Sequence, residues 1–272
     1  MKIPFVKMHG NGNDFVIVDN TKLQVAYNKK IIEKLSNRRT GIGCDQFIFL
    51  EESKDFDIFM KIFNANGEEA EMCGNAARCV ASLIIAGNNK KMVKIETISV
   101  TLIGKLEKNN KISIGLKIPE QKLDNIIDRK NVKKNKVNLS SISSLFKEGT
   151  VVNMGNPHVV FFTENLSNID LEKFGSAIEK NKLFKNGINV EIVEIKSKDV
   201  IKVKFWERGA STTLSCGSGV LAAFYASYAE NKCSSSVKVL LPIGSVNVDI
   251  KNTDLTLTGV PEVSFLGEFS YE

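Results

Sequence analysis

The sequence predicts an α+β fold of two pseudo-symmetric repeats, each a curved, mostly antiparallel sheet around a central helix. The first observation is self-similarity at an offset of 143 residues, which places Gly12-Asn13 on Gly155-Asn156 and Cys73-Gly74 on Cys216-Gly217. The second is that the same succession of strands and helices precedes both cysteines. The third is that an apolar helix follows each of them. Several matches in register at one period indicate two copies of one structural unit.

The repeat runs from Gly12 to Glu120 in the first copy. Its further matched positions, with a small drift at the last pair, are Val16 and Val159, Gln46 and Asn189, Asn64 and Glu207, Lys111–Ile114 and Asp254–Leu257, and Pro119-Glu120 and Pro261-Glu262. One short match would be chance, but this many in register favour a common fold for the two copies.

Both copies are expected to contain the same elements in the same order. Alternation of apolar and polar residues predicts strands, and polar segments of eight to eleven residues between them predict surface helices. For the first copy these are a strand at Phe15–Asp19, a helix at Asn28–Ser36 and strands at Gln46–Glu51 and Asp57–Phe63; for the second they are Val159–Thr163, Asp170–Lys180, Asn189–Ile195 and Val200–Trp206. Alternating strands then close each copy.

The central helices are expected at Gly74–Ala86 and Gly217–Ala229. They carry small and apolar residues on nearly every face, and a helix that is apolar all round is buried. We therefore expect each sheet to wrap around its own helix.

The domain organisation follows from the repeat. Residues 1–120 form the first repeat, 121–149 form a connector and the start of the second domain, and 150–262 form the second repeat. The tail, 263–272, has no counterpart at the end of the first copy, so we expect it to complete the first sheet.

Composition excludes several classes of protein. The chain has 272 residues, 43% of them hydrophobic and 25% charged, as globular proteins do. The net charge is +6, but the lysines are scattered. The densest basic stretch, Arg129–Lys136, lacks the interleaved aromatic residues of a single-strand binding groove, so it predicts a solvated loop and no nucleic-acid partner.

The expected location is the cytoplasm. The chain has no apolar run long enough for a signal peptide or a membrane span, so no membrane association is expected. Five widely spaced cysteines, an odd number, do not suggest a disulfide framework and point to a reducing compartment. The sequence leaves open a homodimer.

Cys73 and Cys216 are the predicted catalytic residues. Both precede a predicted central helix, whose unpaired N–H groups and positive dipole end favour a thiolate and can hold a carboxylate. Two cysteines aimed at one carbon from opposite sides would suit inversion of a stereocentre by proton removal and return. Cys44, Cys79 and Cys233 lack this placement and are expected to be structural. No two cysteines have metal-ligand spacing, so no metal is expected.

Several motifs resemble those of diaminopimelate epimerase. They are Lys7–Phe15 (KMHGNGNDF), Arg39–Gln46 (RTGIGCDQ), Phe63–Gly67 (FNANG), Met72–Cys79 (MCGNAARC), Gly155–His158 (GNPH), Trp206–Ala210 (WERGA) and Leu214–Gly219 (LSCGSG). The resemblance implies a two-domain fold with the active site in the cleft. It also implies interconversion of L,L- and meso-diaminopimelate, a step in making lysine and peptidoglycan precursors, with no pyridoxal phosphate, metal or other cofactor.

The resemblance also implies a set of site residues around a small amino-acid substrate. Cys73 and Cys216 are the acid/base pair, and His158 and Glu207 are auxiliary to them. The substrate-binding residues are Asn13, Gln46, Asn64, Gly74, Asn75, Asn156, Asn189, Glu207, Arg208, Gly217 and Ser218. Such a set suits a substrate with two ammonium and two carboxylate groups, because Arg208 can grip the distal carboxylate with two parallel hydrogen bonds.

One segment departs from the family. Diaminopimelate epimerases commonly have Gly-Ala-Gly-Glu-Thr after Trp-Glu-Arg, whereas this chain has Gly209–Thr213 as Gly-Ala-Ser-Thr-Thr. The missing carboxylate bears on the substrate and on the rigidity of the loop.

Three other functions remain open. A related cysteine-pair racemase for histidine or proline would not need Arg208, Asn64 and Asn189. A non-catalytic nucleotide- or phosphate-binding module is suggested by Gly10–Gly12 and Gly41–Gly43, but no phosphate-binding motif is complete. A redox protein could use the two cysteines as a reversible disulfide.

Overall fold

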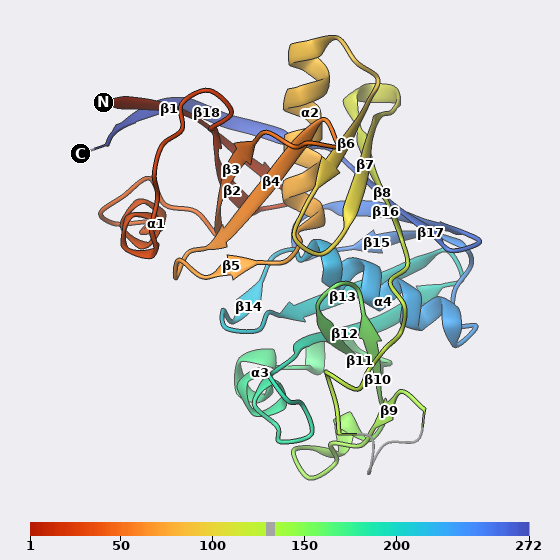
Figure 1. The fold of residues 1–272 in the computed structure, drawn as a ribbon. Helices are drawn as coiled ribbons and strands as arrows, with labels where there is room; N and C mark the ends of the chain where they lie inside the picture. The colour runs from red at the N-terminus through yellow and green to blue at the C-terminus, as the bar shows by residue number, and fades with distance from the viewer. Residues whose placement is uncertain (129–133, 272) are drawn as a thin grey trace. The chain divides into compact units, whose positions relative to one another are not determined.

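The computed structural model of the chain describes residues 1–128 and 134–271 (Figure 1). It divides into two compact units, one of Met1–Leu116 with Thr258–Glu272 and one of Lys117–Leu257. We call them unit 1 and unit 2. Most of the basic stretch predicted as a solvated loop, residues 129–133, lies outside the described residues, as does position 272.

Unit 1 begins and ends with neighbouring strands. Strand β1 (Lys2–Gly10) pairs antiparallel with β2 (Asn13–Asp19) on one side and with β18 (Glu262–Ser270) on the other. Figure 1 shows the two chain ends side by side on β1 and β18. The C-terminal tail therefore adds a strand to the sheet that the N-terminus opens.

The rest of the unit 1 sheet alternates two parallel pairings with antiparallel ones. β2 runs parallel to β3, β4 parallel to β6, and the other neighbours are antiparallel. The strands are β3 (Gln46–Glu51), β4 (Ile58–Asn64), β5 (Glu69–Ala70), β6 (Met92–Glu96), β7 (Thr101–Leu106) and β8 (Ile112–Lys117), with a short 3-10 turn η1 (Lys108–Asn110).

Two helices cover unit 1. Helix α2 (Gly74–Asn88) packs against β1, β2, β6 and β7. Helix α1 (Lys29–Ser36) begins after Asn28, whose side chain caps the Ile31 N–H, and its buried Ile32 joins a core with Val16, Phe47 and Phe49. β3 is buried on both faces, which explains its unbroken apolar run.

Unit 2 repeats this arrangement. β11 runs parallel to β12, β13 parallel to β15, and the other described pairings are antiparallel. The strands are β9 (Lys136–Val137), β10 (Gly149–Asn153), β11 (Pro157–Thr163), β12 (Asn189–Ser197), β13 (Val200–Trp206), β14 (Thr212–Thr213), β15 (Ser236–Leu240), β16 (Ser245–Lys251) and β17 (Asp254–Gly259). The helical segments are η3 (Ser144–Phe146), η4 (Leu166–Asn168), α3 (Leu171–Glu179) and α4 (Gly217–Ala229).

The strand register confirms the predicted repeat. Phe15 lies opposite Gln46 in unit 1, and His158 lies opposite Asn189 in unit 2, both pairs 143 residues apart in sequence. The hairpins differ slightly, because two residues separate Gly10 from its partner and three separate Asn153 from its partner. The α+β fold of two pseudo-symmetric repeats is therefore present.

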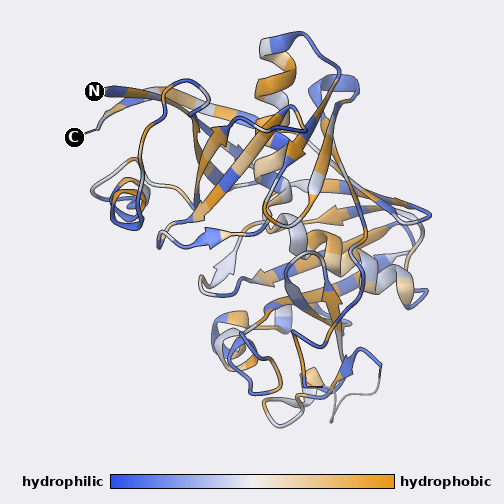
Figure 2. Ribbon diagram, in the orientation of Figure 1, coloured by the Kyte–Doolittle hydropathy of each residue, from blue (hydrophilic) through white to orange (hydrophobic). Residues whose placement is uncertain are grey.

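The central helices are buried where they begin. Every residue of α4 from Gly217 to Phe224 is buried, and so is every residue of α2 from Gly74 to Ala81. The last three residues of α2, Ala86–Asn88, are exposed, because this end projects past the strands that cover its first turns (Figure 1). Figure 2 shows hydrophobic residues concentrated on the strands and hydrophilic ones in the connecting loops. No helix in the described residues is long and apolar enough to span a membrane.

Candidate active site

Cys73 is the residue from which helix α2 starts. Its backbone is extended (φ −144°), and the helix begins at the next residue, Gly74. Its Sγ atom accepts a hydrogen bond from the N–H of Ala76 at 3.5 Å, and the residue is 7% exposed. The N–H groups at this helix end and the dipole both favour negative charge on the sulfur.

Two asparagines surround the Cys73 thiol. Asn13, the first residue of β2, has its Oδ1 atom 3.7 Å from the Cys73 Sγ atom, which donates to it. The same oxygen accepts a hydrogen bond from Nδ2 of Asn75 at 3.3 Å. The structure therefore brings together three of the predicted site residues of unit 1.

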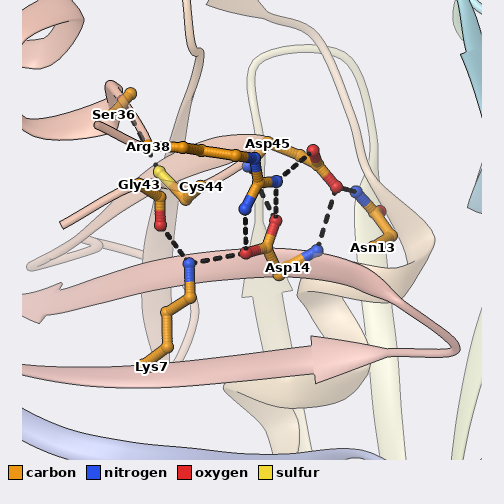
Figure 3. Close-up of polar contacts among 8 residues, drawn as sticks. All are labelled: Lys7, Asn13, Asp14, Ser36, Arg38, Gly43, Cys44 and Asp45. Carbon is orange, nitrogen blue, oxygen red and sulfur yellow. Dashed lines mark hydrogen bonds and ion pairs between the residues drawn. The ribbon is translucent and has the colours of Figure 1, made fainter. Parts of the chain in front are cut away.

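A cluster of charged side chains lies behind Asn13 (Figure 3). Nδ2 of Asn13 donates to the Asp45 carboxylate at 3.0 Å, and Arg38 donates to both Asp45 (2.7 Å) and Asp14 (2.6 Å). Lys7 forms an ion pair with Asp14 at 2.6 Å. Burial alone would raise the pKa of Asp14, but the hydrogen bonds from Arg38 and Lys7 hold it well below its usual range. Both carboxylates are therefore ionised at neutral pH.

Gln46 and Asn64 lie at the same edge of the sheet as Asn13. They are opposite each other on β3 and β4, and Nε2 of Gln46 donates to Oδ1 of Asn64 at 3.0 Å. Oε1 of Gln46 is buried without a hydrogen-bond partner among the described residues. A buried acceptor of this kind is available to an ammonium or amide donor.

Cys216 starts helix α4 in the same way. Its Sγ atom accepts a hydrogen bond from the N–H of Gly219 at 3.4 Å and lies 3.5 Å from the Ser218 hydroxyl. Burial raises the pKa of the Cys216 thiol well above its usual value, and the carboxylates of Glu207 and Glu191 raise it further, while Ser218 and Gly219 lower it. In the substrate-free protein this balance favours the thiol, the form that an acid needs.

A buried histidine–carboxylate pair adjoins Cys216. Nδ1 of His158 is 2.8 Å from Glu191, and its Nε2 is 2.8 Å from Oδ1 of Asn156, whose Nδ2 donates to Ser218 at 3.1 Å. Glu191 was not among the predicted site residues. Its carboxylate fills the space beside Gly219, where an added Cβ would come within 2.7 Å of it. Only glycine therefore allows this approach.

The predicted clamp residues follow β13. Asn189 uses its amide within the protein: Oδ1 accepts from the Arg208 N–H at 2.9 Å, and Nδ2 donates to the Pro157 carbonyl at 2.9 Å. Its contact is thus with the backbone that carries Arg208. Nη1 of Arg208 donates to the Asn186 carbonyl at 3.5 Å, a long bond that a carboxylate ligand could readily displace.

The loop after Arg208 is held by Glu179 of helix α3. One Glu179 oxygen accepts from Nε1 of Trp206 at 2.7 Å and the other from the N–H of Gly209 at 3.0 Å. Thr212, where the family commonly has glutamate, instead donates its hydroxyl to Glu172 on α3. The loop is therefore anchored to α3 at both ends despite its unusual sequence.

We expect Glu179→Ala to weaken both the loop and the activity. It removes two hydrogen bonds and leaves the buried Trp206 N–H without an acceptor, a loss of about 1–3 kcal/mol in the free energy of unfolding. Glu172→Ala is the matched control, because it removes an exposed contact to the same loop and should cost less than about 0.5 kcal/mol. Urea unfolding of both variants measures this, and equal losses would contradict the assignment.

The predicted site residues thus divide between the units. Cys73, Gly74, Asn75, Asn13, Gln46 and Asn64 belong to unit 1; Cys216, Gly217, Ser218, Asn156, His158, Asn189, Glu207 and Arg208 belong to unit 2. Glu191, Asp45 and Glu179 were missed. Among residues 1–128 and 134–271, no three His, Cys, Asp or Glu side chains are grouped as metal ligands would be.

Solved structures with the same fold include enzymes that act on cyclic amino acids. A probable proline racemase from Agrobacterium radiobacter K84 matches with a TM-score of 0.71 at 13% identity, over 99% of this chain and 93% of that one. A hydroxyproline epimerase from Agrobacterium vitis matches with a TM-score of 0.70 at 11% identity, over 98% and 91%. At these identities the likeness establishes the fold alone.

Sequence relatives are much closer. A diaminopimelate epimerase from Carboxydothermus hydrogenoformans is 39% identical over 97% of this chain and 98% of its own length. One from Buchnera aphidicola subsp. Baizongia pistaciae is 36% identical over 95% and 93%. The family model for diaminopimelate epimerase matches residues 5–115 and 150–264. The chain therefore belongs to the diaminopimelate epimerase family and is an isomerase.

Proposed function

We propose that this protein interconverts L,L- and meso-diaminopimelate with Cys73 and Cys216 as the acid/base pair and with no cofactor. The observation that carries the proposal is the equivalent placement of the two cysteines. Each caps a buried central helix, and each sulfur accepts a backbone N–H from three residues further on, Ala76 or Gly219. Membership of the family supports the same reaction.

In the proposed reaction one cysteine, as the thiolate, removes the proton from the α-carbon. The other, as the thiol, returns a proton to the opposite face, which inverts the centre. Negative charge develops on the α-carboxylate in between. The N–H groups of the helix starts at Gly74-Asn75 and Gly217-Ser218 can stabilise that charge, because backbone donors there need no reorganisation.

Recognition of the rest of the substrate is assigned to amides and charged groups. Asn13, Gln46, Asn64 and Asn156 offer hydrogen bonds to ammonium and carboxylate groups, while Glu207 and Arg208 supply charges. We further propose that the reaction serves lysine and peptidoglycan precursor synthesis in the cytoplasm, to which five free cysteines are suited.

The test is exchange of the α-hydrogen with deuterium from solvent, followed by mass spectrometry and chiral chromatography. The panel contains L,L- and meso-diaminopimelate, L-proline, trans-4-hydroxy-L-proline and L-histidine. We expect exchange with inversion on diaminopimelate alone, in buffer that contains a chelator and no pyridoxal phosphate.

The same panel tests the rival functions. The solved proline racemase and hydroxyproline epimerase share the fold, so inversion of proline, hydroxyproline or histidine would replace diaminopimelate as the substrate. A phosphate-binding module would show no exchange on any amino acid, and neither would a dithiol redox protein.

A further inference from the structure

Two equivalent asparagine side chains beside the cysteines point in opposite senses. Asn13 turns its Oδ1 atom toward Cys73 and its Nδ2 atom toward Asp45. Asn156, 143 residues further on, turns its Nδ2 atom toward Ser218, the neighbour of Cys216, and its Oδ1 atom toward His158. The cysteine of unit 1 therefore faces an acceptor, and that of unit 2 faces a chain of donors.

The orientation of Asn13 is set by Asp45. An ionised carboxylate only accepts hydrogen bonds, so the amide must present its nitrogen to it. Asp45 is held in turn by Arg38 at 2.7 Å and by the N–H of Asp14 at 3.1 Å (Figure 3). Unit 2 has Ile188 at the position of Asp45. The anchor is thus specific to unit 1.

The charges near the two cysteines also differ in sign. Arg78 on helix α2 is fully buried, and it interacts electrostatically with Cys73 and with Cys79 on the same helix. Its Nη2 atom donates to Oδ1 of Asn11 at 3.3 Å, while its Nε and Nη1 atoms have no hydrogen-bond partner among the described residues. A buried cation of this kind favours the Cys73 thiolate.

Unit 2 has Leu221 in place of Arg78. The charges that act on Cys216 are the carboxylates of Glu207 and Glu191, the latter beside His158. They favour the Cys216 thiol, while the hydrogen bonds favour its thiolate. At each cysteine, hydrogen bonding and local charge therefore oppose each other, with the signs exchanged between the units.

We propose that Asp45 is a positioning residue that lets Cys73 hold a proton: by fixing Nδ2 of Asn13, it leaves only Oδ1 for the Cys73 S–H, against the pull of Arg78. This inference rests on the proposed function. A group that works as acid in one direction and base in the other must populate both protonation states near the working pH. Arg78 and the helix start supply the thiolate, and the Asp45–Asn13 pair supplies the thiol.

The test is the pH dependence of alkylation in the substrate-free protein. Iodoacetamide reacts with the thiolate, and peptide mass spectrometry follows Cys73 and Cys216 separately. In Asp45→Asn the amide of Asn13 is free to turn and donate to the sulfur, so the midpoint for Cys73 should fall by roughly one pH unit. The midpoint for Cys216 should not move.

Asp14→Asn is the matched control. It removes the same charge from the same cluster but leaves the hydrogen bond between Asp45 and Asn13. We expect its Cys73 midpoint to stay within about 0.3 of a pH unit of the parent. An equal shift in both variants would mean that charge alone acts, and it would overturn the inference.

Asn13→Ala is the second variant, for use if Asp45→Asn does not fold. It removes the acceptor outright, so the Cys73 midpoint should again fall. An unchanged midpoint in the variant that folds overturns the inference. Alkylation does not depend on turnover, so a parent protein that fails to epimerise diaminopimelate refutes the proposed function separately.

Discussion

Cys73→Ala and Cys216→Ala should each lower the rate of diaminopimelate inversion by at least about a thousand-fold, near the upper end of what one acid or base contributes. The reason is that inversion needs a proton donor and a proton acceptor on opposite faces of the α-carbon. Alanine keeps the helix start and its N–H groups, so the carboxylate site is retained. The measurement is the rate of interconversion of the L,L and meso isomers by chiral chromatography.

Deuterium exchange separates the two bases. Each single variant keeps one cysteine, which can still remove and return a proton on its own face. We therefore expect slow exchange with retention on one isomer for Cys73→Ala and on the other isomer for Cys216→Ala. Exchange of both isomers by either variant would contradict the assignment of one cysteine to each face.

The remaining cysteines provide the controls. Burial raises the pKa of Cys44 and of Cys233 to about 11, and that of Cys79 to about 12, so all three are thiols at neutral pH. None of the three is the cap of a helix. Cys233→Ala should therefore keep near-parent turnover, and a loss comparable with that of Cys73→Ala would refute the two-cysteine mechanism.

Much of this fold was predictable because the repeat constrains it twice. The offset that aligns Cys73 with Cys216 also aligns the strand register of Phe15–Gln46 with that of His158–Asn189. Alternation within each strand and the apolar helices after the cysteines were strong local signals. The element bounds came out within about two residues at most ends, as is usual for helix and strand boundaries.

What the sequence did not reveal are long-range contacts of charged residues. Arg78 lies in a helix predicted to be apolar, and nothing local indicates that its guanidinium lies against the turn at Gly10. Glu191 alternates along β12 like any strand residue, yet it pairs with His158 across 33 positions. These partners lie on different elements, so hydrophobic periodicity carries no information about them.

The outcome for Asn189 shows a limit of the repeat itself. It matches Gln46 in sequence, and both were predicted to bind substrate. In the structure Gln46 reaches Asn64 and keeps one acceptor unused, whereas the Asn189 amide is occupied by backbone groups of Arg208 and Pro157. Equivalent positions therefore keep similar geometry while their hydrogen-bond partners diverge. The substrate contact of Asn189 stays a prediction.

Arg208→Lys should lower kcat/KM for diaminopimelate by roughly a hundred-fold, because an ammonium cannot reproduce two parallel hydrogen bonds to a carboxylate. The backbone of Arg208 is fixed by Asn189, so the substitution changes the side chain on an unchanged backbone. Arg39→Lys is the matched control, since Arg39 is exposed and its only described hydrogen bond comes from its backbone N–H. It should leave kcat/KM unchanged.

Lysine tests which part of the substrate Arg208 holds. It equals diaminopimelate without the distal carboxylate, so the parent protein should exchange its α-hydrogen slowly. If Arg208 binds that carboxylate, Arg208→Lys should leave this slow rate nearly unchanged while diaminopimelate turnover collapses. A loss of equal size on both compounds would place Arg208 at the reacting centre instead. An unchanged rate on diaminopimelate would remove it from the site and favour a substrate with one carboxylate.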